Sequence, residues 1–154
     1  MRENKFRAWD KLNGEMVYSD EKQSDYGFDL DNGVVRCYVE CVTVDVCGDE
    51  YIDYDYLDNI MQYTGLKDIN GIGIYEGDIV EFTRKHWNNC NKEYLEKTTK
   101  ELGIIEFFKN LQMSLKVKEE GYNLYQPLLW ALEDDSEIKI IGNIYENSDL
   151  LESR

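Results

Sequence analysis

Two short groups of arginine and aromatic residues have the chemistry to bind an anionic ligand. Arg7 and Trp9 lie two residues apart near the N-terminus, and Arg84, His86 and Trp87 lie together in the middle of the chain. A guanidinium donates paired hydrogen bonds to phosphate, and an indole ring stacks on a base. These five are therefore the predicted ligand-binding residues. The structural alternative is an arginine stem packed over a core aromatic, or a loop with a packed Trp.

A second group of residues is acidic. The chain has a net charge of −15, and residues 20–60 hold 12 Asp and Glu against two basic residues. Four aspartates in this region alternate with tyrosines, which predicts a solvated short helix or loop: Asp49, Asp53, Asp55 and Asp58. This charge repels nucleic acids and anionic membranes and suits a basic protein partner. The alternatives are imitation of the charge of DNA, or solubility alone.

Signatures of catalysis and metal binding are missing from the sequence. It has one histidine, His86, and no G-x-S-x-G or P-loop motif, so we predict no catalytic residue and no enzyme. The alternative is a catalytic pair of carboxylates that the fold brings together. His86 and Cys90 have helical spacing for two zinc ligands, but no second pair accompanies them, so we predict no metal or cofactor. The four cysteines form no C-x-x-C, which favours free thiols in a reducing cytoplasm. No apolar run approaches the length of a membrane span, and no secretion signal is evident.

Short strands and hairpins dominate the first half of the chain. Asn13-Gly14 and Asn32-Gly33 are turn dipeptides, and each stands between two strand-like runs. The run Val34–Val46 is rich in β-branched residues, but its apolar positions change from odd to even numbers. A period-2 strand changes phase in this way through a β-bulge, which we predict near Glu40–Val42.

The stretch Met61–Phe82 contains the strongest turn signals. Asn70-Gly71 predicts a type I′ turn, and Gly77-Asp78 precedes an alternating strand. The expected barrel strands cover residues 79–84, 103–108, 112–117 and 138–142. Between the first two, residues 85–100 have helical spacing and predict a surface helix or lobe. Short helical turns are expected after Pro127 and at Asp149–Glu152.

These patterns predict a mainly β protein with few short helices. Residues 1–62 form an N-terminal β-hairpin region. Residues 63–154 form a small SH3-like barrel of antiparallel strands, with a helical lobe near residues 85–100.

Three blocks carry a family resemblance: KFRAWD at the start, YTGLKD and IYEGDIV in the centre, and IIGNIYENSDLL at the end. In this order they resemble the YopX family of phage and prophage proteins. The resemblance implies a mostly β fold with a small SH3-like barrel, a location in a bacterial host of a phage, and self-association. It implies no reaction.

Two hypotheses and a third, simpler one follow for function. The first is a phage-encoded binding protein that interferes with host defence by sequestering a small nucleotide signal at the arginine and aromatic groups. The second is an acidic module that docks on a basic host protein. The third is a phage accessory subunit with an assembly role. All three expect a cytoplasmic homo-oligomer that binds neither membranes nor nucleic acid directly.

Overall fold

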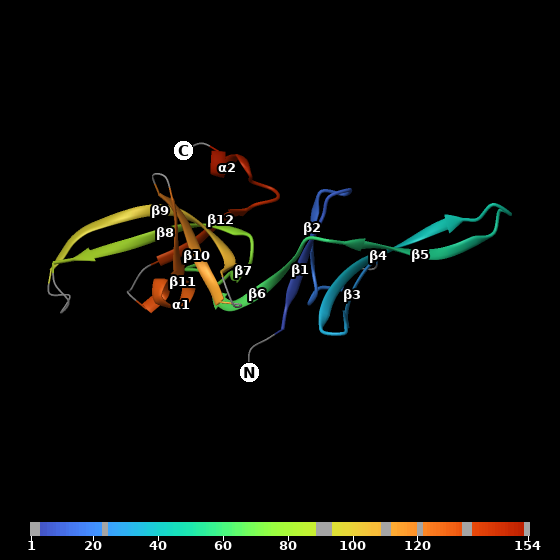
Figure 1. The fold of residues 1–154 in the computed structure, drawn as a ribbon, viewed down its shortest axis with the longest axis horizontal. Helices are drawn as coiled ribbons and strands as arrows, with labels where there is room; N and C mark the ends of the chain where they lie inside the picture. The colour runs from blue at the N-terminus through green and yellow to red at the C-terminus, as the bar shows by residue number, and fades with distance from the viewer. Residues whose placement is uncertain are drawn as a thin grey trace. The chain divides into compact units, whose positions relative to one another are not determined.

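The computed structural model describes residues 4–22, 25–88, 94–108, 112–119, 122–133 and 137–152. This described part is built of antiparallel β-strands with two short helices, as Figure 1 shows. The mainly β fold class is therefore confirmed. The chain divides into two compact units, Met1–Tyr63 and Thr64–Arg154, and strand β6 (Ile60–Lys67) contains the boundary between them.

The first unit joins a hairpin and a three-stranded sheet. Besides the start of β6, its strands are β1 (Phe6–Asp10), β2 (Glu15–Tyr18), β3 (Tyr26–Asp31), β4 (Val34–Val44) and β5 (Glu50–Leu57). β1 lies between β2 and β6, while β4 lies between β3 and β5. The buried core is small and consists of Ala8, Val17 and Cys37 with partly buried neighbours. It therefore supports only one end of the long hairpin formed by β4 and β5.

The second unit is a curled half-barrel. Its elements are β7 (Gly73–Tyr75), β8 (Asp78–Trp87), β9 (Leu95–Phe108), β10 (Gln112–Glu119), β11 (Tyr122–Pro127), α1 (Leu128–Glu133), β12 (Glu137–Asn143) and α2 (Asp149–Glu152). The five-stranded sheet has the order β11-β10-β9-β8-β12. Phe82, Ile105, Leu115 and Ile138 are among the side chains buried in its core. The four predicted barrel strands are all present, and each is longer than expected.

The turns of the two units are set by aspartate side chains as much as by glycine. Asn32 and Gly33 both have positive φ, at 49° and 81°, which confirms a type I′ hairpin between β3 and β4. The type I′ turn predicted at Asn70-Gly71 is wrong, because only Gly71 has positive φ there. The carboxylate of Asp68 accepts hydrogen bonds from the backbone N–H groups of Asn70 and Ile72, at 2.8 and 2.9 Å. These bonds fold residues 68–72 into a wider loop than the dipeptide alone predicts.

Two further predictions about local structure are wrong. The register between β4 and β5 is continuous from Cys37↔Leu57 to Val44↔Glu50, so no bulge occurs near Glu40–Val42. The apolar pattern changes phase there because the outer part of this ribbon is exposed on both faces and needs no single apolar side.

The helix predicted for residues 85–100 is replaced by strand at 85–87 and 95–100, and the described residues Asn88 and Tyr94 form bends. Residues up to Trp87 belong to β8, and residues from Leu95 belong to β9, while 89–93 lie outside the described residues. Arg84↔Thr99 and His86↔Lys97 pair across the two strands, so β8 and β9 continue beyond the barrel as a ribbon (Figure 1). Cross-strand pairing has overridden the local helical spacing.

Candidate functional site

The tip of the β4–β5 hairpin is fixed by one aspartate. The carboxylate Oδ1 of Asp45 accepts hydrogen bonds from the N–H groups of Cys47 and Asp49, at 2.7 and 2.9 Å. Bonds from the backbone of Asp49 and Cys47 lower the pKa of Asp45. Gly48 has a φ of 89°, which an L-residue adopts only with strain. The tip therefore holds the register that decides which side chains share a face.

One face of this ribbon is rich in tyrosine and is largely exposed. The pairs Tyr38↔Tyr56, Glu40↔Tyr54 and Val42↔Ile52 stand side by side across the strands. Of the aromatic and aliphatic side chains here, Tyr54 is 45% exposed, Tyr56 54%, Ile52 60% and Val42 70%. We call this surface the tyrosine face, and its residues are Arg36, Tyr38, Glu40, Val42, Ile52, Tyr54 and Tyr56.

The tyrosine rings are held in a defined arrangement. The Tyr38 ring meets the Tyr54 ring edge-on, with centroids 5.3 Å apart, and the Tyr56 ring at 6.3 Å. A Cβ atom at Gly27 would lie 2.3 Å from Cζ of Tyr38, so the ring occupies the space that glycine leaves open. Arg36 places its guanidinium 5.8 Å from the centroid of the Tyr56 ring. These contacts hold the three tyrosine rings in a defined arrangement on the exposed face.

The four predicted interaction aspartates do not form one cluster. They lie on β5 and its flanks, and the helix or loop predicted there is a strand. Asp53 and Asp55 share the face opposite to Tyr54 and Tyr56, because side chains alternate along a strand. Asp49 precedes β5 and Asp58 follows it, so they stand at opposite ends of the strand. The carboxylates on the tyrosine side are others, including Glu40.

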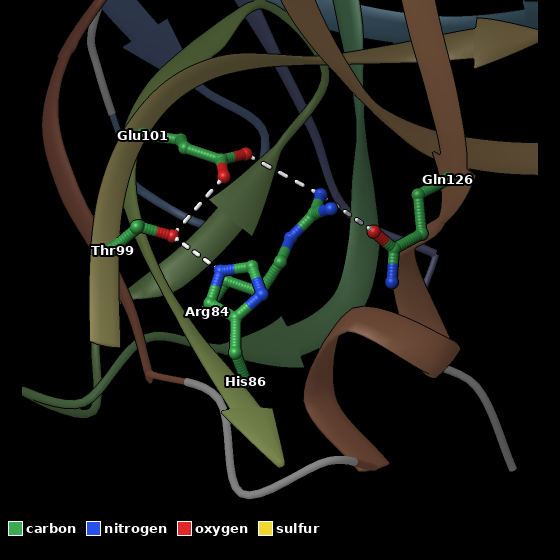
Figure 2. Close-up of polar contacts among 5 residues, drawn as sticks. All are labelled: Arg84, His86, Thr99, Glu101 and Gln126. Carbon is green, nitrogen blue, oxygen red and sulfur yellow. Dashed lines mark hydrogen bonds and ion pairs between the residues drawn. The ribbon is translucent and has the colours of Figure 1, made fainter. Parts of the chain in front are cut away.

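The second candidate region lies on the β8–β9 ribbon, on the same face as the buried Phe82. Figure 2 shows five side chains that we call the polar cluster: Arg84, His86, Thr99, Glu101 and Gln126. Arg84 Nη2 lies 3.3 Å from Glu101 Oε2 and donates a hydrogen bond to Gln126 Oε1 at 3.3 Å. Nε2 of His86 lies 2.9 Å from Oγ1 of Thr99, which donates to Glu101 Oε1 at 3.3 Å.

The polar cluster satisfies most of its own hydrogen-bonding groups. The side chains of Arg84 and Glu101 are only 28% and 24% exposed, and the Arg84 guanidinium also lies 5.7 Å from the Phe82 ring. Oε2 of Glu101 is the exception within the described chain, because it is buried and the ion pair with Arg84 lacks hydrogen-bond geometry. An anion would therefore have to compete with Glu101 for the guanidinium.

The five predicted ligand-binding residues belong to two different units of the chain. Arg7 belongs to the first unit, is 5% exposed, and donates a hydrogen bond from Nε to the sulfur of Met61 at 3.4 Å. Trp9 is half-buried on the same strand, opposite Met16. Arg84 and His86 belong to the second unit and are brought together in the polar cluster. The side chain of Trp87 lies outside the described residues.

The described residues of the two regions form no recognisable metal centre. Among the described residues, no group of three or more His, Cys, Asp or Glu side chains is arranged to hold a metal ion. Cys90, the second of the two possible zinc ligands, lies outside them. Cys37, Cys41 and Cys47 are free thiols. No helix in the described residues has the length and apolar character needed to span a bilayer.

The two units together define a mainly β protein with a curled half-barrel and an exposed acidic ribbon. A model of the YopX protein family matches residues 5–152, nearly the whole chain. The chain therefore belongs to the YopX family, which confirms the resemblance of its three sequence blocks. It is also similar to the crystal structure of protein EF1440 from Enterococcus faecalis, with 25% sequence identity and a TM-score of 0.44 over 98% of this chain and 99% of that one. A comparison with curated proteins gives no match.

Proposed function

We propose that this protein is a non-enzymatic, phage-encoded binding protein that docks on a basic host protein through the β4–β5 ribbon. One observation carries the proposal: an exposed ribbon combines aromatic and aliphatic side chains with a large excess of negative charge. The ribbon carries six carboxylates and one guanidinium, that of Arg36; the carboxylates belong to Glu40, Asp45, Asp49, Glu50, Asp53 and Asp55. Aromatic anchors with complementary charge are typical of protein recognition surfaces.

The proposed setting is the cytoplasm of the bacterial host. There the protein acts as a homo-oligomer that neither enters membranes nor binds nucleic acid directly. Negative charge accelerates encounter with a basic surface, and this effect falls steeply as salt screens it.

The decisive experiment is a pull-down from host lysate with the full chain. A variant in which Asp49, Asp53 and Asp55, three of the six ribbon carboxylates, and Asp58, which directly follows β5, are all changed to Asn should lose most of a specific partner, because the negative field of the ribbon is weakened. Raised salt should have the same effect. A matched control neutralises four carboxylates of the second unit, outside the proposed surface. Partner recovery that responds equally to both sets of substitutions, or to neither, would contradict the docking proposal.

A second candidate function is capture of a small nucleotide signal at the polar cluster. The observation that favours it is the imperfect ion pair there, since Arg84 leaves the buried oxygen of Glu101 without a hydrogen bond. A phosphate could draw the guanidinium away from Glu101, with His86 and Thr99 adding further polar contacts.

Thermal-shift and calorimetric titrations with cyclic nucleotides and ADP-ribose derivatives test this second function. Binding should disappear in Arg84→Met and persist in Arg36→Met, a change of the same kind on the first unit. No response to any of these ligands would remove the nucleotide function and leave the docking proposal untouched.

A further inference from the structure

The contacts of Arg36 show how the tyrosine face binds an arginine side chain. Its guanidinium lies 5.8 Å from the Tyr56 ring centroid, and its Nη2 lies 3.2 Å from Oδ2 of Asp31. Both side chains of this ion pair are 46% exposed, so the contact forms at the surface and not in a core. An aromatic ring below and a carboxylate beside it are the two contacts that hold a guanidinium at an exposed site.

The same combination recurs one step along the ribbon, around Tyr54. Tyr54 stands directly opposite Glu40 across the strands, and Tyr38 supports its ring edge-on. Within the part of the chain that the structure describes, no cationic side chain forms an ion pair with Glu40. The ring of Tyr54 and the carboxylate of Glu40 therefore present a ready place for a guanidinium from another molecule.

We infer that the tyrosine face binds arginine side chains of an extended basic segment of the partner. Tyr54 and Tyr56 are two residues apart on one strand, which places them roughly 6.5–7 Å apart along it. Arginines at alternate positions of an extended chain have the same spacing. Arg36 occupies the Tyr56 position in the free protein, so it competes with the partner for that ring.

The face is a better docking surface than the edge of the sheet. β5 is the outer strand of its sheet, and the alternation of backbone groups directs the N–H of Tyr54 away from β4. Oδ1 of Asp53 accepts a hydrogen bond from that N–H at 2.9 Å. An added strand would have to displace this bond and approach the Asp53 charge, which opposes pairing at the edge. The excess of carboxylates on the ribbon also opposes a second copy of this chain.

This inference rests on the proposed docking function and is tested with a defined probe. The probe is a fluorescent peptide of alternating arginine and glycine, titrated against the full chain at low salt, with a lysine version beside it. Tyr54→Leu should weaken binding of the arginine peptide about fivefold, and Tyr54→Phe should not, because the ring provides the contact. Arg36→Ala should tighten binding by freeing Tyr56 and removing a positive charge.

The matched controls separate a local site from a general acidic field. Glu40→Gln on the tyrosine face and Asp53→Asn on the opposite face remove the same charge, and only the first should weaken the arginine peptide several-fold. Tyr56→Leu provides a second aromatic variant, and far-UV circular dichroism verifies that each variant is folded.

Equal effects of Glu40→Gln and Asp53→Asn, with none from Tyr54→Leu, would overturn the inference and leave acidic docking in place. Failure of the arginine peptide to bind would also overturn it. The docking function is judged separately, by recovery of the partner from lysate.

Discussion

The ribbons β4–β5 and β8–β9 are both pairs of antiparallel strands, but they differ in whether their charged side chains form ion pairs. On β8–β9, Arg84 pairs with Glu101, and Lys100 pairs with Glu81 at 2.6 Å on the other face. On β4–β5, carboxylates outnumber the one guanidinium, and aromatic and aliphatic side chains stay exposed. The charges in these two ion pairs of β8–β9 already have partners within the protein. A ribbon with unpaired carboxylates beside exposed rings gains free energy when a cationic partner covers it.

The largest expected effect on stability comes from comparing a buried aromatic side chain on β8 with an exposed one on β5. Phe82 lies on the core-facing side of β8 and is 1% exposed, so Phe82→Ala should lower the free energy of unfolding by about 3–5 kcal/mol. Tyr54→Ala on the exposed ribbon should cost less than about 1 kcal/mol. Urea unfolding followed by circular dichroism measures both. Similar losses would mean that the β4–β5 ribbon is packed as tightly as the barrel.

A smaller effect on stability is expected from the buried carboxylate of Asp68, compared with the exposed carboxylate of Asp45 at the tip of the β4–β5 ribbon. Burial raises the pKa of Asp68, but hydrogen bonds from the backbone of Ile72, Ile140 and Asn70 outweigh it and lower the pKa below 3.8. The stabilisation is therefore complete above this ordinary value and is lost as pH falls through the lowered pKa. Asp68→Asn should cost about 1.5–3 kcal/mol at neutral pH, and less in acid.

Unfolding measured from pH 7 down to pH 2 tests this prediction. Asp45→Asn at the tip of the acidic ribbon is the matched control, because Asp45 also has a lowered pKa but is exposed, so its loss should change stability much less. Wild type and Asp68→Asn should converge as pH falls. Parallel curves would show that the charge of Asp68 makes no contribution.

The third prediction compares the same substitution in the two ribbons. Arg84→Met leaves the carboxylate of Glu101, 24% exposed, without its cation, so unfolding should become easier by about 1–2 kcal/mol. Arg36→Met breaks an ion pair whose side chains are 46% exposed and should cost less than about 0.5 kcal/mol. Thermal melts at two salt concentrations measure the difference. An equal cost would contradict the contrast between paired and exposed charges.

The smallest effect concerns single amides on the outer edge of β5. The N–H groups of Ile52, Tyr54 and Tyr56 point away from β4, but only that of Tyr54 is bonded by Asp53, at 2.9 Å. Tyr54 should exchange its amide hydrogen several-fold more slowly than Ile52 and Tyr56, as NMR can measure. Asp53→Ala should abolish the difference. Uniform exchange in the wild type would mean that the carboxylate does not protect the edge.

Local sequence was sufficient for much of the fold. Alternating apolar residues and turn glycines predicted the barrel strands, the hairpin at Asn32-Gly33 and the short helix after Pro127, because these depend on neighbours in the chain. It was insufficient where a tertiary contact competes with local preference. Residues 95–100 have helical spacing, yet they pair with β8, since a strand partner satisfies their backbone groups. At Asn70-Gly71, hydrogen bonds to the Asp68 carboxylate determine the conformation of the turn.

The candidate site, too, could be predicted from the sequence only in part. The alternation in Tyr54-Asp55-Tyr56 places tyrosines and aspartates on opposite faces, because this segment is a strand and not the predicted helix or loop. Only the register adds Tyr38 and Glu40 to the tyrosines, because they come from a strand distant in sequence. Burial of Arg7 likewise depends on β1 lying between β2 and β6. Composition by itself determined a β-rich, strongly acidic chain. Strand pairing decided which charges found partners and which remained exposed, because side chains meet across strands and not along the sequence.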